Sequence, residues 1–479
     1  MTPADIDFWV FYVLWALTLI SAAIQINYLA LFLASRFKKI KMKYKLPQRN
    51  SLPTVTVLVA SYNEKNVIAK ALQGILKLDY PMNKIQVVVA DDSDDGTYEI
   101  VRDELNKLKI KGIKTVLVHR DNREGLKSAA LNNALKFVNG KYTLLIDADV
   151  ILPTDIFTKA IPFLLNNPNQ KFLNFEPEFP NRNFNVFTKF YSLSAYFQQE
   201  TYSKSYSHLQ LPFAYTGDSV LLDTAFVKKI GGWKYNVIGD DTYLSLKIWA
   251  KGGQGTHFSP VHPLVEAYPS YGILKKRFLR VNKGIAQAFA VTLKDILKSK
   301  LSVFQKIEVL LSLMPTLVSI FTLLFTAIIV VGIIFSLQAV QKIFTSVEYI
   351  LLTSGLNISF LLLTLFIIKI KKLPLKDYIL PVIVSGYILV PIAIYSIVGF
   401  FQGLLNKKIE FYRAPKFGTM ENFKENYKPS LISRFGTVEF TLMFISLALL
   451  ALSIQKNLYY VTGISLLYLL LTLISSIYI

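Results

Sequence analysis

Two aspartates separated by one residue follow a run that is typical of a buried β-strand. The run is Lys141–Ile146, and the acids are Asp147 and Asp149. Side chains two residues apart in a strand share a face, so both carboxylates can be directed at one point beyond the strand. Two carboxylates at one point need a cation, and Mg²⁺ or Mn²⁺ takes oxygen ligands, completed by the phosphates of a substrate. The pair therefore predicts a metal and diphosphate site, with solvated turn acids as the alternative.

This strand belongs to a series in which short β-rich runs alternate with helical runs through residues 52–300. Such alternation predicts right-handed βαβ units and a mainly parallel sheet, whose ligands lie beyond the carboxyl ends of the strands. Polar clusters follow three of these strands, at 61–64, 91–97 and 147–149. We expect the clusters to meet on one rim. The expected strands are 54–60, 85–90, 115–118 and 142–146, and the expected helices are 65–78, 98–108 and 125–137.

The composition narrows the possible functions. The chain has 479 residues, and several of its runs lack charge for about 20 residues, which is the length that a helix needs to cross a bilayer. The absence of cysteine excludes disulfides, thiolate catalysis and cysteine-ligated zinc. The formal net charge is +21, but the basic residues crowd beside the apolar runs, where they favour anionic lipid headgroups. We therefore expect a membrane partner and no nucleic acid.

The first apolar run, 8–33, predicts an N-terminal transmembrane anchor helix within residues 1–35. Asp5 and Asp7 precede this run without any basic residue, whereas seven basic residues follow it. The positive-inside rule then places residues 52–300 in the cytoplasm, so we expect an integral protein of the cell membrane with a cytoplasmic catalytic domain. The seven basic residues are Arg36, Lys38, Lys39, Lys41, Lys43, Lys45 and Arg49.

Six short motifs follow one another through the domain. They are Val59–Glu64, Asp91–Thr97, Gly125–Asn132, Asp147–Asp149, Gly231–Trp233 and Gly239–Leu246. Their order and spacing resemble family 2 glycosyltransferases, most of all the membrane-embedded branch with the cellulose, chitin and hyaluronan synthases and ceramide glucosyltransferase. The resemblance implies an α/β GT-A fold, which is Rossmann-like with a mixed, mainly parallel sheet, joined here to an α-helical transmembrane domain. It also implies a nucleotide-diphosphate sugar donor, a UDP-sugar, and inversion at the anomeric carbon.

Carried over by position, the resemblance implies a nucleotide pocket at the ends of the first two strands. Asp91 or Asp92 would contact the base or the ribose, and Tyr62 and Glu64 would line the same pocket. Lys127 falls where a cation could face the nucleotide, with a solvated surface residue as the alternative.

The resemblance also assigns the acidic pairs. Asp149 would ligate the Mg²⁺ or Mn²⁺ ion that bridges the diphosphate, and Asp147 would support both donor and metal. Asp240 and Asp241 open a helical pattern, and the second acid at this place is the general base in the family. One such base is sufficient for inverting transfer, because a metal-bound diphosphate leaves without a proton donor. The alternative is that both acids are caps favoured by the helix dipole.

The next motif of the family is Gln-x-x-Arg-Trp, whose arginine approaches the diphosphate and whose tryptophan forms a platform for the acceptor sugar. Here Arg277 stands at the glutamine, Arg280 at the arginine and Val281 at the tryptophan. Arg280 can still bind phosphate, but the missing indole removes the feature that best supports a processive synthase. The same stretch could also contribute to interfacial helices near 271–313 that lie on the headgroups.

Residues 310–479 predict C-terminal transmembrane helices interrupted by a basic loop, 406–434. Part of this loop, Phe411–Gly418, resembles the gating segment of the membrane synthases, which faces the cytosolic active site. Three complete spans between the cytosolic domain and the loop would place the loop outside the cell. We therefore expect the run 379–401, which contains two prolines, to lie in the interface or to re-enter the membrane. The expected apolar runs are 310–337, 349–370, 379–401, 437–454 and 458–479.

These observations predict a membrane-embedded inverting glycosyltransferase that transfers a sugar to a lipid or lipid-linked acceptor at the cytosolic face. The alternative is a processive polysaccharide synthase that extends and translocates a β-linked glycan. A transporter or sensor with a nucleotide-binding domain would belong to a different class and would need no general base. Asp241 together with Asp149 counts against that class.

Overall fold

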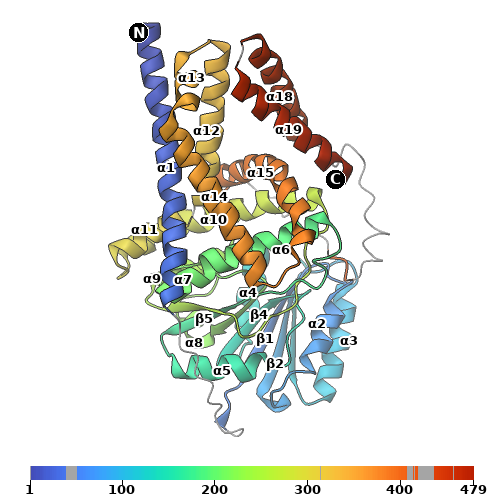
Figure 1. Ribbon diagram of the computed structural model, residues 1–479. Coiled ribbons are helices and arrows are strands. Elements are labelled where there is room, and N and C mark those ends of the chain that lie inside the picture. The colour runs from blue at the N-terminus through green and yellow to red at the C-terminus, as the bar shows by residue number, and fades with distance from the viewer. Residues whose placement is uncertain are drawn as a thin grey trace.

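The computed structural model describes residues 2–38, 51–312, 314–406, 414, 416–418, 436–456 and 458–478. A twisted sheet with helices packed on it forms one part of the molecule, and a group of long helices stands on one side of that part (Figure 1). In Figure 1 the sheet occupies the lower half, and both the N-terminus and the C-terminus lie among the long helices above it.

The sheet has seven strands in the order β3-β2-β1-β4-β6-β5-β7. The pairs β1–β2, β1–β4, β2–β3 and β5–β7 are parallel, whereas β6 runs antiparallel to both β4 and β5. The sheet is therefore mixed and mostly parallel, as the sequence predicts. The strands are β1 Val55–Ser61, β2 Ile85–Asp91, β3 Lys114–His119, β4 Tyr142–Asp147, β5 Gln170–Phe175, β6 Ser219–Asp223 and β7 Gln254–Phe258.

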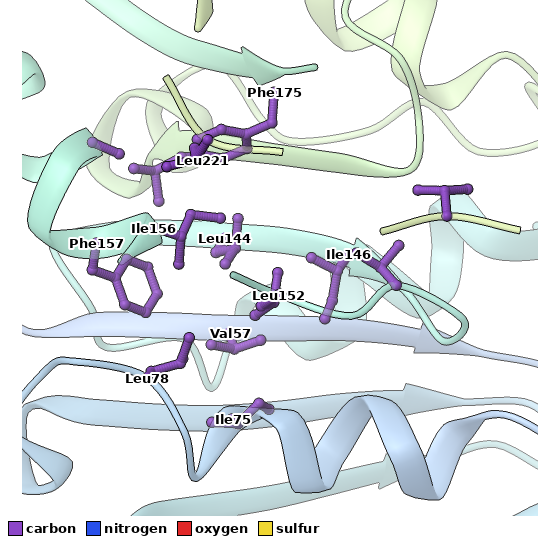
Figure 2. Close-up of a cluster of buried hydrophobic side chains, with 14 of the residues drawn as sticks. Val57, Ile75, Leu78, Leu144, Ile146, Leu152, Ile156, Phe157, Phe175 and Leu221 are labelled. Carbon is purple, nitrogen blue, oxygen red and sulfur yellow. The ribbon is translucent and has the colours of Figure 1, made fainter. Parts of the chain in front are cut away.

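Helices cover both faces of the sheet, which is why its central strands are continuous apolar runs rather than alternating ones. On one face Val57 and Leu144 lie among Ile75, Ile156 and Phe157 (Figure 2). On the other face a second cluster joins alternate residues of β1, β2 and β4 to two buried tryptophans. The helices of this domain are α2 Ile68–Ile75, α3 Thr97–Ile110, α4 Leu126–Leu135, α5 Ile156–Asn166, α6 Val186–Gln198, α7 Lys204–Leu209, α8 Thr224–Lys229 and α9 Asp240–Ala250, and a π-helix, η3 Gln199–Ser203, joins α6 to α7.

Four helices are long and apolar enough to cross a membrane within the part of the chain that the structure describes, and the chain is a membrane protein. The bent pair 375–386 and 388–404, with an angle of 54°, is a broken span or a re-entrant segment. The four are α1 Pro3–Phe37, α12 Met314–Ile334, α14 Val347–Ile370 and α18 Thr437–Gln455. The remaining helices are α10 Tyr271–Lys298, α11 Val303–Leu311, α13 Gln338–Thr345, α15 Leu375–Leu404 and α19 Tyr459–Tyr478.

Two sets of polar contacts mark the two ends of the helix group. At the end remote from the sheet, Asp7 of α1 accepts a hydrogen bond from the Ala339 backbone at 2.9 Å. At the same end the Lys456 ammonium donates to the carbonyl of Ile333 at 2.6 Å. The turn after α12, the turn after α18 and the start of α1 therefore lie together.

The opposite ends of these helices reach the sheet domain. Arg36, at the end of α1, pairs with Glu200 at 2.9 Å, and Lys371, after α14, lies 3.3 Å from the same glutamate. Glu439, in the first turn of α18, pairs with Lys275 of α10 at 3.0 Å. The polypeptide thus runs toward the sheet along α1 and α14 and away from it along α18.

Both ends of α15 lie at the domain end of the helix group. Asp377, near its start, lies 3.8 Å from Lys189 of α6, and Gln402, near its end, accepts from Lys283 of α10 at 3.4 Å. The two ends of α15 therefore lie on the same side of the helix group, and the interfacial or re-entrant placement of the run 379–401 stays a prediction. This geometry places the ends of α15 and α18 that flank residues 406–434 on the domain side. Most of that loop lies outside the described residues, and its cytosolic location stays a prediction.

α10 and α15 are held together at two glycines of α15. A Cβ atom on Gly399 would lie 2.2 Å from the carbonyl oxygen of Leu279, and one on Gly403 would lie 2.3 Å from that of Lys283. No larger residue fits without separating the two backbones, so the helices touch main chain to main chain. We refer to this contact as the α10–α15 seam.

Candidate active site

The site forms where the parallel strands end. β1, β2 and β4 lie side by side, and their register brings Ser61 beside Asp91 and Ala60 beside Asp147. The loop before β6 crosses the end of β4, because the Asp147 backbone donates to the carbonyl of Asp218 at 3.1 Å. Polar residues of three separate motifs therefore share one rim, as expected for this kind of sheet.

Lys127, in the first turn of α4, joins two of the predicted acids. Its ammonium lies 2.7 Å from Asp147 and 3.9 Å from Asp240. Burial alone would lower the pKa of Lys127, but the carboxylates of Asp147 and Asp240 outweigh it and raise the pKa above its ordinary value. The side chain is therefore a charged bridge between the end of β4 and the start of α9, and not a solvated surface lysine.

Asp149 is paired with a second lysine. Lys416 lies 2.7 Å from its Oδ2 atom, and the two side chains are only 11% and 6% exposed. Each carboxylate of the Asp-x-Asp pair thus holds an ammonium group from a distant part of the chain. Among the described residues, no cluster of three or more histidine and acidic side chains could hold a metal by itself.

These two carboxylates nevertheless fit an Mg²⁺ or Mn²⁺ ion. Their oxygens are the donors that such ions prefer, and the lysine at each of them shows that the position accommodates positive charge. An ion held by Asp149 and supported by Asp147 would obtain its remaining ligands from a diphosphate.

Asp218 is a third acid at this place, and the sequence pattern does not single it out. Burial raises the pKa of Asp218 to about 7, and the neighbouring Asp147 and then Asp149 contribute to the same shift. It lies in an irregular loop after Gly217, without an acidic partner nearby in the sequence. The only local signal is its position directly before a strand, which many loop acids share.

Asp240 and Asp241 occupy the first turn of α9, but neither is the cap residue, which is Gly239. Asp241 Oδ1 accepts a hydrogen bond from the Thr242 backbone at 2.7 Å. Burial raises the pKa of Asp241, although Thr242, Lys127 and Arg280 counteract it. Burial likewise raises the pKa of Asp240 to about 6, against the effect of Lys127. Asp241 is therefore a carboxylate with increased basicity beside the rim.

The two acids at the end of β2 are paired with basic side chains. Asp91 is fully buried and lies 2.8 Å from Nδ1 of His119, while Asp92 holds Arg120, whose Nε donates to Oδ1 at 2.7 Å. Tyr62 contacts Arg123, whose guanidinium carbon lies 3.4 Å from the centre of the tyrosine ring.

This cluster lies at the end of β2, in the same sheet edge as the carboxylates at the end of β4. The structure therefore places the predicted base-binding residues on the same rim as the predicted metal residues. The carbonyl of Glu64, the remaining predicted pocket residue, accepts the backbone hydrogen bonds that start α2. Their roles toward a nucleotide stay predictions.

The two arginines of α10 have different surroundings. The charge of Arg280 acts to lower the pKa of both Asp241 and Tyr268, so Arg280 lies near the rim. Arg277 lies among aromatic rings instead, with its guanidinium carbon 5.2 Å from the ring centre of Tyr191 and 5.3 Å from that of Tyr268. Arg277 lies close enough to counteract the raised pKa of Asp218. Its predicted role as a substrate contact is not tested by this arrangement.

Residues 53–280 match the protein-family model described as glycosyltransferase like family 2. Among curated proteins, the chain is 27% identical over 287 residues to "Probable glucomannan 4-beta-mannosyltransferase 10" of Arabidopsis thaliana, covering 58% of this chain and 52% of the relative. It is also 27% identical over 262 residues to "Probable glucomannan 4-beta-mannosyltransferase 6" of Oryza sativa subsp. japonica, covering 54% and 46%. The chain therefore spans about half the length of these relatives.

Among solved structures, the fold is similar to that of a mannosyltransferase from Pyrobaculum calidifontis in complex with GDP-Man and Mn²⁺. The TM-score is 0.59 at 21% identity, and the match covers 83% of this chain and 100% of that one. This similarity confirms the predicted GT-A fold.

Proposed function

We propose that this membrane protein is a family 2 glycosyltransferase that transfers a sugar from a nucleotide-diphosphate donor to a growing glycan, because residues 53–280 match the model of that family. The named relatives are probable glucomannan mannosyltransferases, which favours the polysaccharide alternative over the lipid acceptor. Their names, and the GDP-Man bound by the Pyrobaculum calidifontis mannosyltransferase, favour GDP-mannose over the UDP-sugar expected above.

The observation that carries the proposal is the convergence of the acidic motifs on one rim. Asp147, Asp240 and Lys127 are joined by ion pairs, and Asp218 adds a further buried carboxyl group beside Asp147. A concentration of buried acids is unfavourable without a cation, because their charges repel one another. A site of this kind is suited to a metal-bound diphosphate and unsuited to a neutral ligand.

In the proposed reaction the acceptor hydroxyl attacks the anomeric carbon, and its proton passes to Asp241. The carbon–oxygen bond to the diphosphate breaks, and the nucleoside diphosphate leaves with that electron pair. A divalent ion, when bound at Asp149 and Asp147, would neutralise the charge that develops on the leaving group. Arg280 would add positive charge near Asp241, and one base without an acid is consistent with inversion.

A second candidate is supported by one residue. Val281 stands where the synthases have the tryptophan that stacks on the acceptor sugar, and valine offers no such surface. A lipid-linked acceptor that receives one or a few sugars would not need this platform. We further propose that the domain faces the cytosol, since the basic residues after α1 support that orientation.

The test is a donor panel with two classes of acceptor. The full chain, purified in detergent, is incubated with Mn²⁺ and radiolabelled GDP-mannose, UDP-glucose or UDP-N-acetylglucosamine, together with manno-oligosaccharides or a membrane lipid extract. Label in long water-soluble glycan supports the polysaccharide function, and label in the organic phase supports the lipid acceptor. If no donor transfers label to either acceptor, the proposed function is wrong.

A further inference from the structure

Lys416 reaches the site from the other end of the chain. It lies between α15 and α18 in the sequence, and its ammonium is 2.7 Å from Asp149 Oδ2. The same ammonium is 4.8 Å from the centre of the Tyr268 ring. The ammonium therefore contacts two groups, the carboxylate predicted to hold the metal and the face of an aromatic ring beside it.

The backbone next to Lys416 is held by one acid. Phe417 and Gly418 donate their backbone N–H groups to the Glu266 carboxylate at 3.2 and 3.1 Å. Gly418 has a φ of +70°, and a Cβ atom there would lie 2.8 Å from the carbonyl oxygen of Asn66. A glycine is therefore needed for this close approach. These contacts fix the backbone next to Lys416, and this fixed backbone positions the ammonium group at Asp149.

We infer that Lys416 is an internal cation of the metal site. Its ammonium excludes a divalent ion without nucleotide from Asp149, and it is displaced from Asp149 by the complex of that ion with a nucleoside diphosphate. This inference rests on the proposed function, because it assumes that Asp149 is the metal ligand. It goes beyond that function in naming which form of the metal binds.

The physical reason is competition for one buried carboxylate. An ammonium and a divalent ion on the same oxygen repel each other strongly where little water screens them. An ion that arrives alone must displace Lys416 and leave its charge without a partner, which is costly for a buried group. A diphosphate brings new oxygens, and ammonium groups bind phosphate well, so Lys416 can exchange one anion for another.

A mere structural pairing predicts something different. If Lys416 served only to attach its segment to the domain, its removal would leave the affinity of Asp149 for metal unchanged or lower. The two possibilities are therefore distinguished by the direction of the change in metal affinity.

The experiment measures Mn²⁺ binding to the full-length protein in detergent by the loss of the free-ion electron paramagnetic resonance signal. Lys416→Gln keeps a similar side-chain length without the charge. Lys159→Gln is the matched control, because Lys159 also pairs with an aspartate, Asp155 at 2.5 Å, but on α5.

Without nucleotide, we expect Lys416→Gln to bind Mn²⁺ about 5- to 150-fold more tightly than the wild type, the usual range of coupling between two ligands, and Lys159→Gln to resemble the wild type. With saturating GDP the difference between Lys416→Gln and the wild type should shrink. Equal or weaker binding by Lys416→Gln without nucleotide would overturn the inference.

The Mn²⁺ measurement does not depend on turnover. If Mn²⁺ affinity rises in Lys416→Gln but no donor is used, the proposed function fails and the inference about the cation site stands. If sugar is transferred while Mn²⁺ affinity does not respond to Lys416, the inference alone fails.

Discussion

Replacing Asp241 with asparagine should separate proton acceptance from folding. Asp241 Oδ1 accepts the Thr242 N–H at 2.7 Å, and an asparagine oxygen can accept the same bond. Gly217 lies beside the other oxygen and has no side chain to crowd it. A Cβ atom on residue 217 would lie only 3.1 Å from Oδ2. The side-chain amide therefore fits without rearrangement. We expect Asp241→Asn to fold normally and to bind donor with nearly wild-type affinity.

Turnover should fall much further. A positioned general base contributes about 10²- to 10⁴-fold, which corresponds to about 2.7 to 5.4 kcal/mol in the activation barrier at 1.36 kcal/mol per tenfold change. The pH profile gives a second sign of the same role. Burial raises the pKa of Asp241, and only its ionised form can accept a proton. Wild-type turnover should therefore be lost on the acidic side at a higher pH than the ordinary aspartate pKa of about 3.9 would give.

Donor affinity and turnover have to be measured on the same preparation, the first by calorimetry with GDP and Mn²⁺ and the second by sugar transfer. A metal or folding defect lowers both quantities, whereas loss of the base lowers only turnover. Asp240→Asn is the matched control with an identical chemical change one residue away. If Asp241→Asn retains near-wild-type turnover, Asp241 is not the base, and the role passes to Asp240 or to another carboxylate of the rim.

Asp149→Ala should abolish metal-dependent nucleotide binding, and unchanged GDP affinity with and without Mn²⁺ in calorimetry would contradict the metal assignment. Gly284→Ala should lower the melting temperature and turnover together, because its Cβ atom would lie 2.7 Å from the Gly239 nitrogen at the start of α9, where Asp240 and Asp241 begin; a thermal melt and a transfer assay check this, and an unaltered melting temperature would show that α9 accommodates the methyl group. Ser430→Cys, introduced into a chain without cysteine, should react with an impermeant thiol reagent only in inside-out vesicles, and labelling of right-side-out vesicles would place residues 406–434 on the opposite side of the membrane.

Local patterns predict β1 to β4, whereas β5, β6 and β7 and the antiparallel direction of β6 are not among the predicted elements. The runs expected at 54–60 and 142–146 are β1 and β4 with ends that differ by one residue, because a buried parallel strand is apolar on both faces and stops at a polar cluster. The rim could be predicted for the same reason, since parallel strands deliver their carboxyl ends to one edge. The helix starting at Asp240 was also correctly predicted.

What the sequence does not predict is how charges pair across the molecule. Lys127 meets Asp147 across 20 residues, and Lys416 meets Asp149 from the opposite end of the chain, so no local spacing links either pair. Asp218 lies on a loop whose backbone is positioned by β4, not by its own neighbours. The short helix α13 was missed because it lies between two apolar runs and has only eight residues.

The α10–α15 seam has a consequence for how the bilayer acts on the enzyme. Two helices in main-chain contact at Gly399 and Gly403 have no compressible side chains between them, so a tilt of α15 moves α10 by the same amount. α10 carries Arg280, whose charge acts on Asp241. We therefore expect a change in bilayer thickness that tilts α15 to shift Arg280 as well, so that lipid composition would alter the rate of the proposed reaction without any lipid entering the active site.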